Sequence, residues 1–80
     1  MLKLGIYQHY KGNLYQVIGV ARHEETHEPL AVYQKLYDDY ALWVRPLDVF
    51  LETVTVNGTT VPRFAFVKEH LLTPPKVDAL

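Results

Sequence analysis

The chain has 80 residues, 49% of them hydrophobic, and its eight Lys and Arg nearly balance nine Asp and Glu. This length and apolar content predict one small folded domain, and they exclude both a second domain and a disordered chain. The near-zero net charge excludes a bulk positive field for non-specific nucleic-acid binding. Because Cys is absent, disulfides and thiolate metal sites are excluded as well, which favours a cytoplasmic protein.

The sequence predicts neither export through a signal peptide nor insertion into a membrane. No apolar run approaches the roughly 20 residues that span a bilayer, and the N-terminus lacks the apolar stretch of a signal peptide. We therefore expect no membrane partner. We place the single domain at residues 1–67. Residues 68–80 contain Pro74-Pro75 and no sustained period, which predicts a mobile tail.

Alternating apolar residues and turn signals predict short antiparallel strands along the whole domain. Gly12 and Asn13 tolerate the backbone of a tight hairpin, and Asn57-Gly58 is the strongest hairpin signal in the chain. Pro46 stops ladder pairing and predicts one 3₁₀ turn over 46–50. The predicted strands cover residues 4–9, 14–22, 30–37, 41–45, 51–56 and 59–67. Five or six such strands predict an all-β, antiparallel SH3-like barrel, because closure removes exposed edges.

The segment 14–22 is largely apolar on both faces, which predicts a central strand. Gly19 inside it predicts a bulge or a bend. Alternation and turn spacing predict that the residues contributing to the core include Leu14, Ile18, Val20, Val32, Leu36, Val44, Phe50 and Phe64.

Several sequence blocks follow one another in a distinctive order. They are Gly5-Ile6-Tyr7-Gln8-His9-Tyr10-Lys11-Gly12, Ala21-Arg22-His23-Glu24-Glu25-Thr26-His27-Glu28, Val32-Tyr33, Leu36-Tyr37 and Trp43-Val44-Arg45-Pro46-Leu47. The ordered series resembles a bacterial family, the domain of unknown function 1653 (DUF1653), over residues 5–67. The resemblance implies a small SH3-like barrel of bacterial, cytoplasmic origin. It implies no reaction and no ligand, because a fold alone does not confer a function.

The run His23-Glu24-Glu25-Thr26-His27 matches the H-E-x-x-H zinc-binding string letter for letter. That motif works on a helix, which places both His on one face with the Glu as general base. Here the string follows a strand pattern and meets Pro29 two residues later, so a helix of sufficient length is not expected. We interpret the run as a solvated loop, and we predict no metal and no cofactor.

Trp43 and Arg45 are two apart on a predicted strand and therefore share one face. The Arg45 guanidinium would then lie beside the indole, directed at a carboxylate or phosphate. Asp48 offers a competing interpretation, slightly favoured here, in which it pairs with Arg45 and neutralises it.

Tyr33 and Tyr37 lie four apart with Lys35 between them, a spacing that would suit a stacking platform for single-stranded nucleic acid. Acidic residues in the flanking loops oppose this interpretation, since they would repel a phosphate backbone. They are Glu24, Glu25, Glu28, Asp38 and Asp39.

Tyr7, His9 and Lys11 alternate along the first strand and would form a second recognition strip. The alternative, which we favour, places Tyr7 in the core and the other two on the rim, because small barrels use aromatic residues to fill core volume.

These observations favour a non-catalytic binding module for a peptide, protein or small polar or anionic partner. Ser and Cys are both absent, which removes the commonest acyl-transfer nucleophiles. A nucleic-acid-associated domain is the second hypothesis, and a small metal-dependent hydrolase using His9, His23 and Glu28 is the third. The candidate binding residues are Tyr7, His9, Lys11, Arg22, His23, Tyr33, Tyr37, Trp43 and Arg45.

Overall fold

The computed structural model describes residues 2–69, which form seven strands and one short helix. The elements in chain order are β1 (Gly5–His9), β2 (Leu14–Arg22), β3 (Pro29–Lys35), β4 (Leu42–Pro46), α1 (Leu47–Phe50), β5 (Thr53–Val56), β6 (Thr59–Pro62) and β7 (Phe64–Lys68). The predicted tail falls, apart from its first two residues, outside the described part of the chain. Within that part, no helix is long and apolar enough to cross a membrane.

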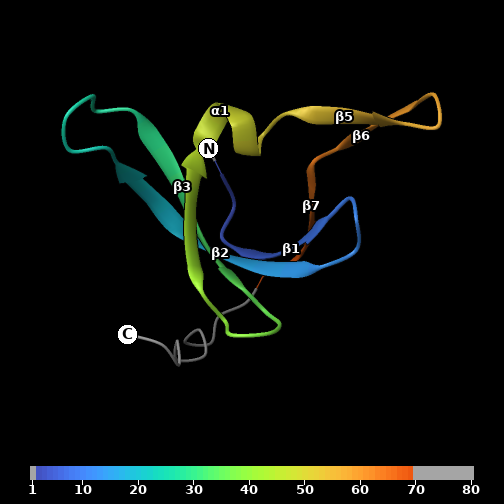
Figure 1. The fold of residues 1–80 in the computed structure, drawn as a ribbon, viewed down its shortest axis with the longest axis horizontal. Helices are drawn as coiled ribbons and strands as arrows, with labels where there is room; N and C mark the ends of the chain where they lie inside the picture. The colour runs from blue at the N-terminus through green and yellow to red at the C-terminus, as the bar shows by residue number, and fades with distance from the viewer. Residues whose placement is uncertain (1, 70–80) are drawn as a thin grey trace.

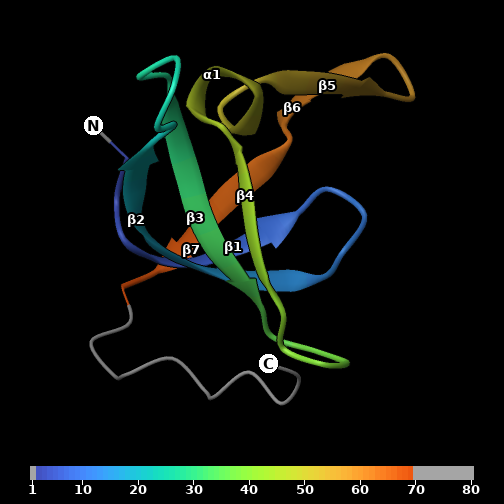
Figure 2. The ribbon, with the colours of Figure 1, turned by 60° about the vertical axis from the view of Figure 1, so that its left-hand side comes forward.

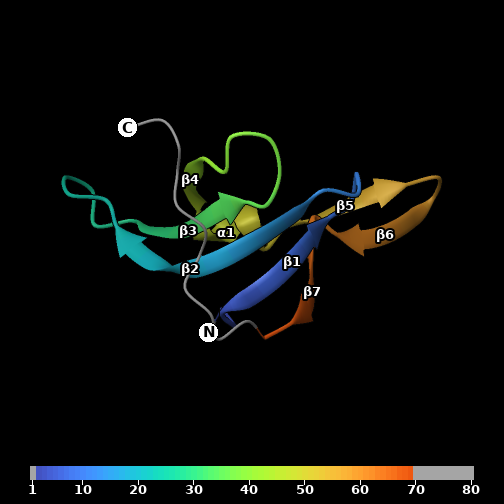
Figure 3. The same ribbon diagram turned by 90° about the horizontal axis from the view of Figure 1, so that it is seen from below.

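Five strands form one antiparallel sheet in the order β4-β3-β2-β1-β7 (Figure 1). The β5–β6 hairpin forms a separate two-stranded sheet, and Figure 3 shows it extending outward beyond the end of β1. β4 and β7 are the two edges and do not pair with each other (Figure 2). The strands of residues 2–69 therefore form an open, curved sheet with a hairpin, where the sequence predicted closure into a barrel.

Strand positions follow the predicted ranges closely at β1, β2, β3 and β4, and two predictions need correction. The predicted strand 59–67 is two strands, because the backbone leaves the ladder at Arg63 and β7 joins β1 rather than β5. The turn after Pro46 is α-helical rather than 3₁₀. The hairpin at Asn57-Gly58 is confirmed, since both residues have positive φ, as the tightest hairpin turns require.

The core is an aromatic cluster on the inner face of the five-stranded sheet. Phe50 of α1 stacks on Phe64 of β7, with ring centroids 4.2 Å apart and planes 7° apart. Tyr33 of β3 contacts both rings, at 5.3 and 5.5 Å between centroids. The buried cluster consists of Tyr7, Val17, Ala31, Tyr33, Phe50 and Phe64.

Half of the predicted core is exposed in the structure, including Val20, which lies opposite the buried Ala31 and so on the inner face. Phe50 and Phe64 are buried as predicted, and Val32 and Leu36 are half-buried. The remaining four, Leu14, Ile18, Val20 and Val44, are exposed. The inward face of β2 instead carries Tyr15 and Val17, and the predicted bulge is present as a register shift between Val17 and Gly19. The misassignment has a physical cause: with apolar residues on both faces of β2, alternation alone does not identify the buried face.

Candidate functional site

A pocket of about 200 Å³ opens on the inner face of β2, β3 and β4, beside the aromatic core. Strand register brings its lining residues together. Tyr15 lies opposite Lys35, and Tyr33 lies opposite Trp43. Residues directly opposite on antiparallel strands point to the same side of a sheet. The complete lining is Tyr15, Tyr33, Lys35, Tyr37, Trp43 and Arg45.

The Arg45 guanidinium is held at one end of this pocket by the core. Its Nε donates a hydrogen bond to the Tyr33 hydroxyl at 3.2 Å, and its Cζ lies 5.8 Å from the centre of the Phe64 ring. Trp43, two residues earlier on β4, is 52% exposed next to it. The shared face predicted for Trp43 and Arg45 is therefore confirmed.

The predicted ion pair between Arg45 and Asp48 is wrong. Residues 2–69 contain ion pairs of Lys35 and of Arg63, but none of Arg45. Helix α1 begins immediately after β4, and the Asp48 carboxylate accepts a hydrogen bond from the Val49 backbone N–H at 2.8 Å. Arg45 thus keeps both terminal Nη groups, a planar pair of donors matched to a carboxylate or phosphate.

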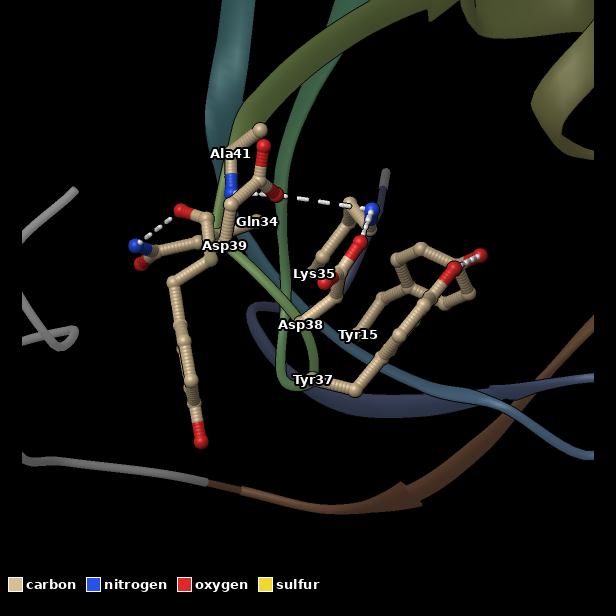
Figure 4. A network of polar contacts seen from close by, with 8 residues as sticks. Tyr15, Gln34, Lys35, Tyr37, Asp38, Asp39 and Ala41 are labelled. Carbon is tan, nitrogen blue, oxygen red and sulfur yellow. Dashed lines mark hydrogen bonds and ion pairs between the residues drawn. The ribbon is translucent and has the colours of Figure 1, made fainter. Parts of the chain in front are cut away.

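At the opposite end of the pocket, Lys35 already has carboxylate partners, because its ammonium lies 3.4 Å from carboxylate oxygens of both Asp38 and Asp39 (Figure 4). Asp38 and Tyr40 have positive φ, which turns the β3–β4 loop back toward Lys35. The backbone N–H of Ala41 donates to Asp39, and this hydrogen bond, ahead of the Lys35 charge, lowers the pKa of that carboxyl. Two carboxyl groups therefore face one ammonium at this end of the pocket.

Two tyrosine hydroxyls meet over the pocket. The Tyr15 and Tyr37 oxygens are 2.6 Å apart, and Figure 4 shows the two rings leaning together from β2 and from the β3–β4 loop. Burial, and then the hydrogen bond to Tyr37, raises the pKa of Tyr15 to about 12. The Tyr15 hydroxyl is therefore protonated at neutral pH. Since one hydroxyl donates to the other, one proton of the pair remains for a ligand.

The family follows from comparison with known proteins. The chain matches the profile described as "Protein of unknown function (DUF1653)" over residues 5–66. The chain belongs to the DUF1653 family. A crystal structure of a DUF1653 protein from Bordetella bronchiseptica is similar, with 38% identity and a TM-score of 0.79, covering 92% of this chain and 95% of that one. No curated protein matches at a significant level.

In this DUF1653 chain, the predicted strip of Tyr7, His9 and Lys11 is not one exposed surface. Tyr7 is only 6% exposed, and its hydroxyl donates to the Lys3 carbonyl at 2.7 Å. The His9 ring is half-buried with its centroid 4.9 Å from that of Phe64, and Lys11 lies in the exposed turn after β1. The favoured alternative, with Tyr7 in the core and the other two on the rim, is confirmed.

Burial and the positive charges near the Arg45 end of the pocket both affect the protonation of His9. Burial, followed by the positive charges of Arg45, Arg63 and Lys11, lowers the pKa of His9. Its Nδ1 accepts a hydrogen bond from the Lys11 backbone N–H at 3.1 Å. The imidazole is therefore neutral at pH 7 and leaves the positive charge there to the guanidinium groups.

Arg22 and His23 lie apart from the pocket, at the end of β2 and in the β2–β3 loop. Arg22 donates to the His27 carbonyl at 3.1 Å. The His23 Nδ1 accepts from the Glu25 backbone N–H at 3.1 Å, and the H-E-x-x-H run forms a turn, not a helix. Among residues 2–69, no group of three or more His, Cys, Asp and Glu is placed to hold a metal ion.

The sequence-based site omitted Tyr15. It lies one strand away from Tyr33 and Tyr37, and its ring contacts both, at 5.5 and 5.6 Å between centroids. The signal that would have found it is the pairing register of β2 with β3, which puts Tyr15 opposite Lys35. Local sequence spacing does not contain that information.

Proposed function

We propose that this chain is a non-catalytic binding module that recognises a peptide or a polar, anionic partner through the pocket of β2, β3 and β4. One observation carries the proposal: the Arg45 guanidinium has no carboxylate partner within residues 2–69, yet its orientation is fixed by the Tyr33 hydroxyl beside the exposed Trp43 ring. A preoriented cation next to an exposed aromatic ring suits ligand recognition. We further propose that the fold belongs to the SH3-like class, as an open variant.

The chemistry of the pocket favours binding over catalysis. Its lining consists of four aromatic side chains, one Lys and one Arg, with no carboxylate or imidazole among them to serve as a general base. The pKa of Tyr15 is raised to about 12, so its hydroxyl is a poor nucleophile at neutral pH.

A nucleic-acid-associated domain is the second candidate, and the aromatic lining favours it, since bases stack on exposed aromatic side chains. The charges oppose it. Asp38 and Asp39 lie at the Lys35 end, where their carboxylates would repel a sugar–phosphate backbone.

Nuclear magnetic resonance of ¹⁵N-labelled protein tests the proposal. Small acids, short peptides and short oligonucleotides are added, and the indole N–H of Trp43 and the Nε–H of Arg45 are followed. We expect at least one ligand class to shift both signals saturably. Arg45→Lys keeps the charge but loses the planar fork, and it should abolish the shift of Trp43. Arg22→Lys is the matched control, because Arg22 is an exposed Arg outside the pocket lining.

Two results would contradict the proposal. One is that no ligand class perturbs Trp43. The other is that Arg45→Lys and Arg22→Lys bind every ligand as tightly as the wild-type chain does.

A further inference from the structure

The two ends of the pocket differ in charge, and this difference constrains the occupant. At the Lys35 end, two carboxylates face one ammonium, so the cluster carries one net negative charge. At the Arg45 end, one guanidinium stands without a carboxylate in residues 2–69. The pocket therefore has one uncompensated positive charge at one end and a net negative charge at the other.

Hydrogen-bond donors gather at the Arg45 end. The Tyr33 hydroxyl accepts from Arg45 Nε, so its own proton remains for an acceptor. The two Nη groups of Arg45 add a planar pair of donors there. The Tyr15–Tyr37 pair, which lies beside Lys35, supplies one hydroxyl proton elsewhere in the pocket. A ligand group that accepts several hydrogen bonds and carries one negative charge satisfies this arrangement.

Size and surface add a second constraint. The volume of about 200 Å³ is below the roughly 300–1,000 Å³ of pockets that hold drug-sized ligands, so it suits one ring and its substituent. The Trp43 indole is 52% exposed beside Arg45, which gives a flat apolar group a surface to stack on.

Resting on the proposed function, we propose that the occupant is an aryl carboxylate: its carboxylate binds the Nη groups of Arg45, and its ring lies on Trp43. A free aromatic acid and a peptide ending in an aromatic residue both present this chemistry. A phosphate monoester is disfavoured because it carries about −1.5 to −2 charges, more than the single guanidinium compensates, next to Asp38 and Asp39.

Fluorescence of Trp43, the chain's single tryptophan, reads out occupancy directly. Two acids are tested, phenylacetate and acetyl-glycyl-phenylalanine with a free carboxylate, and each is compared with its neutral amide. Phenyl phosphate and a short oligothymidylate are the phosphate-bearing ligands. We expect both acids to change the emission saturably and both amides to bind about ten- to a hundredfold more weakly, as loss of a charge-assisted hydrogen-bonded pair predicts. Comparing the two acids separates the free acid from the peptide as the source.

Variants separate recognition from structure. Arg45→Lys should weaken phenylacetate binding about tenfold or more, and Arg22→Lys should leave it unchanged. The double change Asp38→Asn and Asp39→Asn frees Lys35. Asn tolerates the positive φ at residue 38 and still accepts from the Ala41 N–H at residue 39. That variant should strengthen phenyl phosphate binding more than phenylacetate binding.

The outcomes distinguish this inference from the proposed function. If phenyl phosphate or oligothymidylate binds more tightly than the acids, and Arg45→Lys abolishes that binding, the pocket recognises phosphate and only the carboxylate assignment fails. If the acids and amides bind alike in the wild type and in Arg45→Lys, or if no ligand changes the emission, both proposals fail.

Discussion

The inner face of the sheet has a closed half and an open half, which share strands β2 and β3. On the closed half, Phe50 of α1 covers Phe64 and Tyr33 and is itself only 1% exposed. On the open half, no element among residues 2–69 covers Trp43. Tyr33 belongs to both halves, since its ring packs in the core and its hydroxyl meets Arg45 at the pocket.

One small sheet thus holds both a core and a candidate site, and the reach of α1 separates them. The single turn of α1 is placed by Pro46, which ends β4 and turns the chain so that Phe50 points into the core. One helical turn reaches only part of the inner face. Changes in the closed half should therefore act on stability, and changes in the open half should act on binding.

The largest expected effect is in the closed half. Phe64→Ala removes a buried ring that stacks on Phe50 and contacts Tyr33, so it should lower the free energy of unfolding by about 3–5 kcal/mol. Urea unfolding followed by circular dichroism measures this. Phe66→Ala, on the same strand but 39% exposed, is the control and should cost about 1 kcal/mol. Equal losses for the two variants would show that the closed half is not the core.

A smaller effect is expected at the boundary. Tyr33→Phe keeps the buried ring but removes the hydroxyl that accepts from Arg45 Nε, and this should cost about 1 kcal/mol of stability. The same change should weaken ligand binding, because the guanidinium loses the group that orients it. Tyr10→Phe, at an exposed position outside the pocket, is the comparison. If Tyr33→Phe binds the ligand as tightly as the wild type does, the Tyr33 hydroxyl does not contribute to binding.

A pH effect is expected at the edge of the open half. The pKa of His9 is lowered from 6.5 in the folded chain, so between these two values the unfolded chain binds more protons. The stability that His9 contributes is present above pH 6.5 and is lost as the pH falls through the folded pKa. His9→Gln should flatten the decline in the free energy of unfolding as the pH falls below 6.5. An identical slope in His9→Gln would contradict this.

Local patterns in the sequence predicted most of the strands and four of the six residues that line the pocket. The shared face of Trp43 and Arg45 could be predicted from alternation within one strand. The Asn57-Gly58 hairpin could be predicted from local turn chemistry. Placing Tyr15 in the site requires the pairing register of β2 with β3. Identifying the inward face of β2 requires knowing which of its two apolar faces α1 and β7 cover. The prediction of an Arg45–Asp48 ion pair was wrong for a related reason. The close spacing suggested contact, but the helical turn directs Asp48 elsewhere.

The central claim is that Arg45 serves ligand binding rather than the fold, and urea unfolding of wild type and Arg45→Lys, with and without phenylacetate, tests it most directly. Without ligand, the two proteins should agree within about 1 kcal/mol, because Arg45 contributes one hydrogen bond and no ion pair within residues 2–69. Phenylacetate at about ten times its Kd should raise the free energy of unfolding of the wild type by about 1.4 kcal/mol and leave Arg45→Lys nearly unchanged. The account would be contradicted if Arg45→Lys is destabilised without ligand and if phenylacetate raises its free energy of unfolding as much as that of the wild type. Arg45 would then have a structural role only.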